Sequence, residues 1–539
     1  MMLKNVRFVI LIGVVLQGWS CQHKKTAAER PNILFVISDD QSFAHTSFTG
    51  STFVNTPAFD RIAREGVYFS NCIAGSPGCA PSRSSIVTGR YPWQNEQSGQ
   101  HASSWSRKYI PFIDALEKGG YSTGRTGKGV GPFQYARDEH DSLWRATNAG
   151  GIAHSDIKHD KKENLEGYTD KISATDYYEN FRYFMENIKG DKPFFFWYGA
   201  HEPHRAYEKG SWKRMGKRPE DVQVPGFLPD NEEVRGDLLD YAVEIEWFDR
   251  HLGYILKYLA DTGELENTMV IVTSDNGKPF PRAKANTYEY GIHVPMAIRY
   301  PAKFPGGRIV EDPVSFVDIA PTILEVARTN PGAMMPITGK SFLGILTSDR
   351  EGYVKEADTY AFSGRERHSS SRYKNRGYPQ RAIRSRDFLY IWNMRPERWP
   401  AGAPRKYDPK DTLQLLPVNG VGDDGKYIPQ SAYTDIDDCP AKTYLLEHAG
   451  DEAIKPFLDL AVRKRPEFEL YAIKTDPYCL ENLAGMPEFA ADEQKLRQEL
   501  TDELKRTEDP RVVGPDKEIF DRYKRYSPLR KFPEPAPSR

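Results

Sequence analysis

Short apolar runs alternate with longer amphipathic stretches through residues 30–350. Residues 32–37, Asn-Ile-Leu-Phe-Val-Ile, predict a strand buried on both faces, as the strands of parallel sheets are. Similar runs predict strands at residues 67–69, 194–198, 269–273 and 294–300. Apolar positions at helical spacing predict helices at residues 57–64, 113–118, 174–188, 238–259 and 319–326.

This alternation predicts an α/β domain over residues 30–350, with a large central, mostly parallel sheet sandwiched by helices. In such folds the loops at the carboxyl ends of the strands form the binding site. Beyond residue 350 the buried runs become sparse, with a strand predicted at 388–392 and a closing helix at 490–505. We therefore expect a smaller C-terminal α+β subdomain over residues 351–539, which ends in a Pro-rich tail from residue 527.

The first 21 residues have the pattern of an export signal. Lys4 and Arg7 precede an apolar stretch at residues 8–16 that is too short to span a bilayer. Residues 18–21, Gly-Trp-Ser-Cys, resemble a loose lipobox, in which Cys21 is lipidated. The alternative is an ordinary secretory signal that is cut nearby. Both predict an exported protein in the periplasm or on the surface of a bacterium, and the first adds a membrane anchor at Cys21.

The composition excludes several classes of protein. A chain of 539 residues with 39% hydrophobic residues and a net charge of −1 is neither disordered nor broadly nucleic-acid-binding. Its five cysteines are too few for a disulfide scaffold. Apart from Cys21 and Cys79, which have other expected roles, Cys72, Cys439 and Cys479 allow at most one bridge.

Acidic and amide side chains directly follow two of the predicted strands. Asp39 and Asp40 follow the first strand, and Asp275 and Asn276 follow a later one. Adjacent carboxylates at a strand end repel each other unless a cation lies between them. An all-oxygen set of this kind suits Ca²⁺ or Mg²⁺ rather than zinc. Each pair alone also fits a turn or a helix cap, but the two together favour a metal site.

Cys79-Ala80-Pro81-Ser82-Arg83, followed by Thr88-Gly89, is the most informative segment of the chain. Taken alone, it also fits a small buried cysteine at the start of a helix whose first turn holds Pro81. It resembles the Cys-x-Pro-Ser-Arg signature of the type I sulfatases. Further resemblances to that family lie at Gly127-Lys128, His201 to His204, Ser274 to Gly277 and residues 291–295, 318–322 and 469–484.

The resemblance implies an alkaline-phosphatase-like fold and a hydrolase with a modified cysteine. In the family, a formylglycine-generating maturation enzyme oxidises the residue matched by Cys79, and the hydrated aldehyde attacks the sulfur of a sulfate ester. Loss of a proton from the second hydroxyl then releases sulfate, which splits the reaction in two. The metal ligands, which hold one Ca²⁺ or alternatively Mg²⁺, fall on Asp39, Asp40, Asp275 and Asn276.

The remaining catalytic roles also transfer by position. The arginine that holds the formylglycine falls on Arg83, the lysines that grip the sulfate fall on Lys128 and Lys284, and the histidine that protonates the leaving group falls on His204. Most relatives have a histidine two residues after the Gly-Lys, whereas this chain has Val130 there. Either another residue serves as second-step base, with His101 and His201 as candidates, or the intermediate decays with less help; both histidines are also expected to bind substrate.

Residues 274–286 and 201–205 most resemble the branch of the family that contains heparan N-sulfatase, a sulfamidase, and bacterial sulfatases of algal polysaccharides such as ulvan. A sulfamidase has arginine at the position of Lys284, whereas O-sulfatases have lysine. The resemblance therefore favours ester over sulfamate hydrolysis, with sulfamidase as the alternative.

A basic stretch at residues 365–386 holds Arg365, Arg367, Arg372, Lys374, Arg376, Arg381, Arg384 and Arg386 against only Glu366 and Asp387. It suggests recognition of a polyanion, with Arg365, Arg367 and His368 as the expected contacts. The alternative is a solvated, partly ion-paired loop.

The sequence therefore predicts an exported sulfatase that acts on a sulfated polysaccharide or its oligosaccharides, an algal glycan such as ulvan or a glycosaminoglycan. Its expected partners are the saccharide, the maturation enzyme and, through Cys21, a membrane, with no nucleic acid. Two rival functions are a phosphatase or phosphodiesterase on the same scaffold and a surface lipoprotein that binds anionic glycan without cleaving it. A two-metal, His-rich site would favour the phosphoesterase.

Overall fold

The computed structural model describes residues 30–135, 144–160, 168, 171–372, 375–404 and 432–523. Its central sheet consists of β1 (Asn32–Ser38), β2 (Val67–Ile73), β4 (Ser122–Gly127), β6 (Phe194–Gly199), β7 (Thr268–Ser274), β8 (His293–Arg299), β9 (Arg308–Val310) and β10 (Val314–Ser315). The spatial order is β10-β2-β8-β7-β1-β6-β4, with β9 beside β2. The pairs are parallel except those that β8 makes with β2 and β7.

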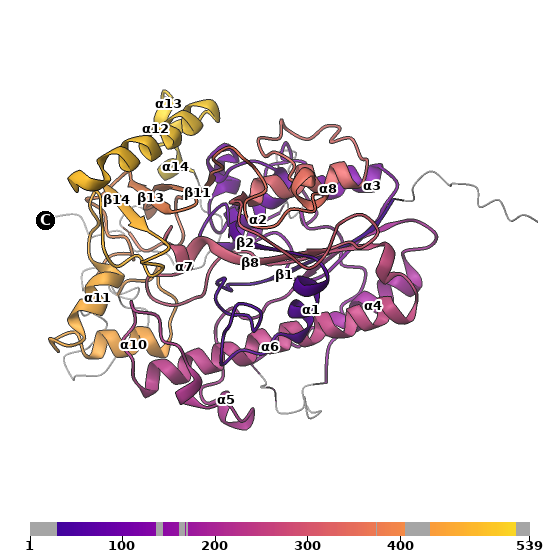
Figure 1. Cartoon of the computed structure of the whole chain (residues 1–539), viewed down its shortest axis with the longest axis horizontal. Helices are drawn as coiled ribbons and strands as arrows, with labels where there is room; N and C mark the ends of the chain where they lie inside the picture. The colour runs from indigo at the N-terminus through magenta and orange to yellow at the C-terminus, as the bar shows by residue number, and fades with distance from the viewer. Residues whose placement is uncertain are drawn as a thin grey trace, which may run out of the picture. The chain divides into compact units, whose positions relative to one another are not determined.

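Helices lie on both faces of this sheet. The helices of this part of the chain are α1 (Pro57–Glu65), α2 (Cys79–Thr88), α3 (Phe112–Lys118), α4 (Tyr177–Asn187), α5 (Ser211–Arg214), α6 (Glu232–Asp261), α7 (Glu289–Ile292), α8 (Ile319–Val326) and α9 (Leu343–Leu346). Figure 1 shows α2, α3 and α8 on one side of the sheet and α1, α4 and α6 on the other. The short strands β3 (Ser103–Ser104) and β5 (Phe133–Gln134) form a separate pair.

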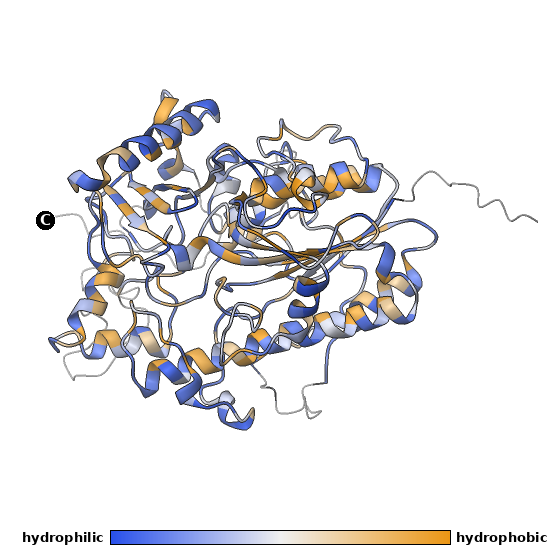
Figure 2. Ribbon diagram, viewed as in Figure 1, coloured by the Kyte–Doolittle hydropathy of each residue, from blue (hydrophilic) through white to orange (hydrophobic). Residues whose placement is uncertain are grey.

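The alternation of side chains along β1 explains the two layers. Ile33, Phe35 and Ile37 pack in the core that contains side chains of α2, α3 and α8. Leu34 and Val36 point the other way, into the core shared with α1, α4 and α6. In Figure 2, α6 alternates between apolar and polar residues, as expected for a helix with one face buried on the sheet.

A second, four-stranded antiparallel sheet lies in the C-terminal part of the chain. It consists of β11 (Ala361–Arg365), β12 (Gln380–Arg384), β13 (Phe388–Asn393) and β14 (Phe468–Ala472), in that spatial order. The helices of this part are α10 (Pro440–Glu447), α11 (Lys455–Val462), α12 (Ala490–Arg506), α13 (Pro510–Val513) and α14 (Ile519–Arg522). Leu496, Leu500 and Leu504 of α12 pack in one core with Ile383 and Tyr390 of the sheet. Both sheets belong to one unit, residues 31–539.

The predicted fold class is confirmed: a mostly parallel sheet between helices, with a C-terminal subdomain built on an antiparallel sheet. The predicted helix at 238–259 is part of α6, a helix of 30 residues. This helix begins earlier than predicted because the side chain of Asn231 caps its N-terminus and accepts a hydrogen bond from the amide of Val234. The sequence pattern missed β4, since Ser-Thr-Gly-Arg-Thr-Gly carries almost no apolar signal.

Three of the sequence-based expectations involve segments outside the described residues: the N-terminal signal with Cys21, the Pro-rich tail and Lys374. The four described cysteines, Cys72, Cys79, Cys439 and Cys479, are all free thiols. Within the described residues, every helix is too short or too polar to cross a bilayer.

Candidate active site

The predicted metal ligands meet because their strands are parallel neighbours. Ser38 of β1 is in register with Ser274 of β7, so the residues that follow each strand leave the same edge of the sheet side by side. The amide of Asp40 donates to Oδ1 of Asp275 at 3.0 Å. Nδ2 of Asn276 donates to Oδ1 of Asp40 at 2.8 Å. The side chains of this acidic cluster are almost completely buried.

The acidic cluster fits a divalent cation. Oδ1 of Asp39 and Oδ1 of Asn276 are buried and accept no hydrogen bond from the described residues. A buried oxygen without a partner is costly, and a hard cation satisfies it. Burial raises the pKa of Asp275 to about 7. Burial alone would also raise the pKa of Asp39. Lys128 and the other nearby cations outweigh this effect and hold the pKa of Asp39 well below its usual range. Asp39, Asp40, Asp275 and Asn276 would therefore hold the ion.

Cys79 is the first residue of α2 and is fully buried. Its Sγ forms a cluster with carboxylate oxygens of Asp39 and Asp275 in which all three atoms lie within 4.8 Å of one another. Burial raises the pKa of the Cys79 thiol to about 11. An unmodified cysteine here would remain a thiol at neutral pH and be a poor nucleophile. The geometry thus suits a cysteine that is used in another chemical form.

Arg83 joins three strand ends from inside the protein. Its Nε donates to Oδ2 of Asp275 at 2.6 Å. Its Nη1 donates to the carbonyls of Lys128 and Gly129 after β4, at 3.1 and 3.0 Å, and its Nη2 donates to the carbonyl of Ser38 at 3.4 Å. Arg83 therefore forms hydrogen bonds with a predicted metal ligand, Asp275, and with the loop that carries Lys128.

The two lysines face the acidic cluster from opposite sides. Nζ of Lys128 lies 2.5 Å from Oδ2 of Asp39. Nζ of Lys284 lies 2.5 Å from Oδ2 of Asp40 and 3.0 Å from Oδ2 of Asp437. Nearby carboxylates raise the pKa of both lysines against the opposing effect of burial, so both are ammonium groups at neutral pH. They are placed to bind an anion beside Cys79.

His204 is oriented by the backbone. Its Nδ1 lies 2.6 Å from the carbonyl oxygen of Arg205, so Nδ1 carries a proton and donates a hydrogen bond to that oxygen. Nε2 is thereby directed into the site, 3.8 Å from Oδ2 of Asp40. This tautomer leaves Nε2 available to transfer a proton to or from a bound ligand.

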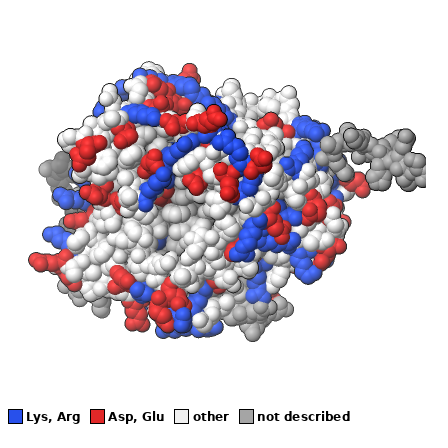
Figure 3. Space-filling model, viewed as in Figure 1, with Lys and Arg blue, Asp and Glu red and all other residues white. Residues whose placement is uncertain are grey.

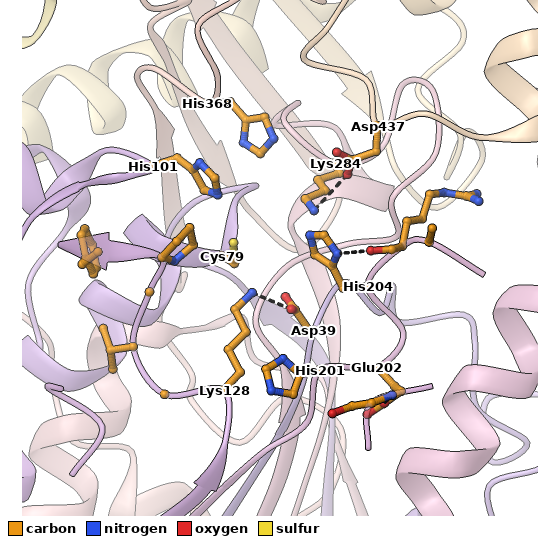
Figure 4. Close-up of a pocket in the computed structure, with 18 of the residues that line it drawn as sticks. Asp39, Cys79, His101, Lys128, His201, Glu202, His204, Lys284, His368 and Asp437 are labelled. Carbon is orange, nitrogen blue, oxygen red and sulfur yellow. Dashed lines mark hydrogen bonds and ion pairs between the residues drawn. The ribbon is translucent and has the colours of Figure 1, made fainter. Parts of the chain in front are cut away.

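Cys79, both lysines and His204 open onto one cavity of about 720 Å³ (Figure 4). The predicted residues that line it are Asp39, Cys79, His101, Lys128, His201, His204, Lys284 and His368. His101 and His368 face each other, with ring centroids 4.9 Å apart. Burial lowers the pKa of His201 to about 4 and that of His368 to about 3, so both are neutral at physiological pH. The cavity therefore contains both candidates for the second-step base, His101 and His201.

The sequence analysis missed three acidic residues that also line the cavity, Glu202, Glu244 and Asp437. Glu202 is the second residue of the His-Glu-Pro-His segment, so this segment offered a local signal for it. Glu244 lies in the middle of α6, and Asp437 lies in an irregular segment before α10, so no local pattern distinguishes either residue.

The prediction that the basic stretch recognises substrate is corrected for most of its members. Arg365 and Arg372 are buried and both donate to Asp435. Arg381 is buried between Glu366 and Asp509. These guanidinium groups neutralise acidic residues elsewhere in the fold. The error arose because counting local charges ignores carboxylates that lie far away in the sequence.

Two more arginines of the stretch are also inside the protein. Arg367 is buried, and its Nη1 donates to the carbonyl of Tyr523, so it is corrected with Arg365. Arg384 pairs with Glu289. Of the three individual contacts that were expected, His368 alone lines the large cavity. On the face seen in Figure 3, lysine and arginine side chains lie among aspartate and glutamate.

Comparison with known proteins agrees with this geometry. The sequence profile of the family described as Sulfatase matches residues 31–329, and the profile described as N-sulphoglucosamine sulphohydrolase, C-terminal, matches residues 283–399. An ulvan-active sulfatase of Formosa agariphila is 28% identical over 510 residues, which cover 88% of this chain and 74% of that protein. The N-sulphoglucosamine sulphohydrolase of Homo sapiens is 27% identical over 531 residues, which cover 90% of this chain and 92% of that protein.

A solved structure has the same fold. It is a protein in complex with its substrate D-glucosamine-2-N,6-O-disulfate, with a TM-score of 0.59 and 20% sequence identity, and the match covers 89% of this chain and 99% of that one. The family profile spans more than half of the chain, and it includes the acidic cluster, Cys79 and both lysines. The chain therefore belongs to the sulfatase family and is a sulfuric ester hydrolase.

Proposed function

We propose that this protein is an exported sulfatase that removes ester-linked sulfate from a sulfated polysaccharide or its oligosaccharides. Conversion of Cys79 to formylglycine would supply the nucleophile, and one Ca²⁺ at the acidic cluster would withdraw electrons from the sulfate group. The observation that carries the proposal is the convergence of Sγ of Cys79 with the oxygens of Asp39 and Asp275, within 4.8 Å of one another.

The residues of the chain have separable roles in this reaction. Lys128 and Lys284 bind the sulfate oxygens, on which negative charge increases as the ester bond breaks. His204, when both of its ring nitrogens are protonated, would donate the Nε2 proton to the departing oxygen of the sugar. Arg83 keeps the end of β7 and the loop after β4 together, so that Asp275 and Lys128 stay aligned. Burial of the acidic cluster excludes water and strengthens each of these electrostatic interactions.

The names of the relatives suggest the substrate class. They include an ulvan-active sulfatase and an N-sulphoglucosamine sulphohydrolase, and a solved structure of similar fold is described as a 2-O GAG sulfatase, so an ulvan-type or glycosaminoglycan oligosaccharide is the proposed substrate. Sulfamidase activity is the second candidate, because the human relative is a sulphohydrolase of N-sulphoglucosamine. Lysine at position 284, where the sulfamidases have arginine, favours an ester.

The test is a desulfation screen of the protein coexpressed with a formylglycine-generating enzyme. Peptide mass spectrometry should find formylglycine at position 79, and free sulfate should be released from defined ulvan, carrageenan, heparin or chondroitin oligosaccharides. Cys79→Ser should lower sulfate release to background while the melting temperature stays within about 2 °C, because the side chains are nearly the same size.

Four outcomes would contradict parts of the proposal. Only unmodified thiol in active protein from the native host would exclude formylglycine. Phosphate esters turned over much faster than sulfate esters would favour the phosphoesterase, and sulfate released only from N-sulfoglucosamine would favour the sulfamidase. Mature protein with formylglycine and metal but no activity on the whole panel would favour a glycan-binding role.

The cellular location is proposed from the sequence alone. Residues 1–21 direct export, and lipidation at Cys21 would hold the enzyme at a bacterial membrane. Membrane fractionation in the native host tests this, because Cys21→Ser should move the protein from the detergent phase to the aqueous phase. An unchanged distribution would leave the ordinary secretory signal as the better explanation.

A further inference from the structure

A carboxylate from the C-terminal part of the chain lines the cavity. Oδ2 of Asp437 is 3.0 Å from Nζ of Lys284, and ligand atoms of Asp437, Asp40 and His204 lie within 4.8 Å of one another. Figure 4 shows Asp437 and Lys284 on the His204 side of the cavity. Since His204 faces the departing oxygen, the sugar that carries the sulfate would lie close to Asp437.

Two further carboxyl groups line the same cavity. Glu202 and Glu244 are each only 2% exposed. Glu202 accepts hydrogen bonds from the amide of Ser173 and the hydroxyl of Tyr177, at 2.8 and 2.6 Å. Oε1 of Glu244 has no hydrogen-bond partner among the described residues. A carboxyl group can hydrogen-bond a sugar hydroxyl in either protonation state, but it attracts no anion.

The cations that line the cavity are largely paired already. Lys128 contacts Asp39, and Lys284 lies between Asp40 and Asp437. Arg205 forms a two-pronged pair with Asp237 at 2.7 and 2.9 Å. Lys171 is exposed at the edge of the described cavity. Of the described cations that line the cavity, Lys128 and Lys284 therefore serve the sulfate and the acidic cluster, Arg205 is held by Asp237, and Lys171 alone is exposed.

The rest of the wall is uncharged. His368 is neutral, and Ser369 lies beside it. Val130, Phe133 and Tyr135 add an apolar face of the kind that packs against the C–H groups of a sugar ring. These groups can bind hydroxyls and ring carbons, and they do not compensate an extra negative charge.

We infer that the sulfated sugar residue bound in this cavity carries no second anionic group beside the reacting sulfate, and that Asp437 enforces this selection. The inference rests on the proposed function, and it names the substrate class more narrowly: a monosulfated, otherwise uncharged residue. A second anion near Asp437 is repelled at close range in a partly buried site, which corresponds to about 10- to 100-fold in kcat/KM.

The experiment compares 4-nitrophenyl sulfate with its 3-carboxy analogue in the matured enzyme. The uncharged ester should have a kcat/KM about 10- to 100-fold higher. Asp437→Asn should reduce this ratio at least fivefold, and Asp437→Ser is a second variant if the first fails to fold. Asp438→Asn is the matched control, because Asp438 pairs with Lys442 and does not line the cavity, so the ratio should not change.

Comparing this ratio between wild type and variant cancels the difference in leaving-group chemistry between the two esters. Equal or faster turnover of the carboxylated ester, or a ratio unchanged in folded Asp437→Asn or Asp437→Ser, would overturn the inference while leaving the proposed function intact. No sulfate release from either ester or from any glycan of the screen would overturn the proposed function and this inference together.

Discussion

The structural role assigned to the basic stretch can be tested at Asp435. This carboxylate is 2% exposed, and its Oδ2 accepts hydrogen bonds from Nη2 of Arg365 and Nη2 of Arg372, at 2.7 and 2.6 Å. Its Oδ1 accepts the amide of Ser369 and the hydroxyls of Ser369 and Ser371, at 3.0, 2.6 and 2.7 Å. Asp435→Asn removes the charge but keeps the shape, so two buried guanidinium groups lose their counter-ion.

Removing one partner of a buried ion pair costs about 3–5 kcal/mol. Unfolding roughly 500 residues at about 2.1 cal/mol/K per residue gives an entropy of about 1 kcal/mol/K, so the melting temperature should fall by about 3–5 °C. Differential scanning fluorimetry at pH 7 measures this. Asp438→Asn is the control and should shift the melting temperature by less than 1 °C, since a partly exposed pair contributes about 1 kcal/mol at most.

The effect should also depend on pH. Burial raises the pKa of Asp435, but Arg372 and Arg365 outweigh it and hold the pKa well below its usual range. A lowered folded-state pKa stabilises the protein above the unfolded-state pKa of about 3.9, and the stabilisation is lost as the pH falls toward the folded-state pKa. The difference in melting temperature between wild type and Asp435→Asn should therefore have its full size at pH 7 and become smaller below about pH 4. A variant that melts with wild type at pH 7 but has a raised KM for sulfated glycans would refute this reasoning and restore the arginines as substrate contacts.

Two other predictions concern the site itself. Ca²⁺ at 100 times its Kd should stabilise the protein by about 2.7 kcal/mol, or roughly 3 °C in melting temperature. Asn276→Ala should abolish most of that shift, because it removes a buried ligand oxygen. An equal shift in the variant would place the ion elsewhere. Gly277→Ala should give insoluble or inactive protein, since a Cβ there would lie 1.8 Å from a backbone carbonyl oxygen, whereas Gly450→Ala meets nothing within 4 Å and should be neutral. Soluble expression and sulfate release of both variants check this, and a fully active Gly277→Ala enzyme would contradict the close approach.

The sequence alone determined the fold class and indicated residues that the structure brings together at the candidate active site. Apolar runs such as residues 32–37 identify the strands, and parallel neighbours bring the residues that follow them to one edge of the sheet. Asp39, Asp275 and Cys79 could be assigned because each lies in a short motif at a strand end or helix start, where the local pattern also sets the side-chain position. Even there, β4 escaped detection, because its polar sequence lies in a sheet edge recognised only by pairing with β6.

Only the tertiary structure decided which charges face the substrate. In the sequence, Arg365 and Arg372 stand in a basic stretch, but folding places Asp435 against both, and Arg381 against Glu366 and Asp509. The same packing brings Asp437 to Lys284, more than 150 positions earlier in the chain. Coulomb interactions depend on distance in space, and burial multiplies their strength, so charge counted along the chain does not predict the field in the cavity. That field, which no local pattern encodes, is set by how the C-terminal segments pack onto the central sheet.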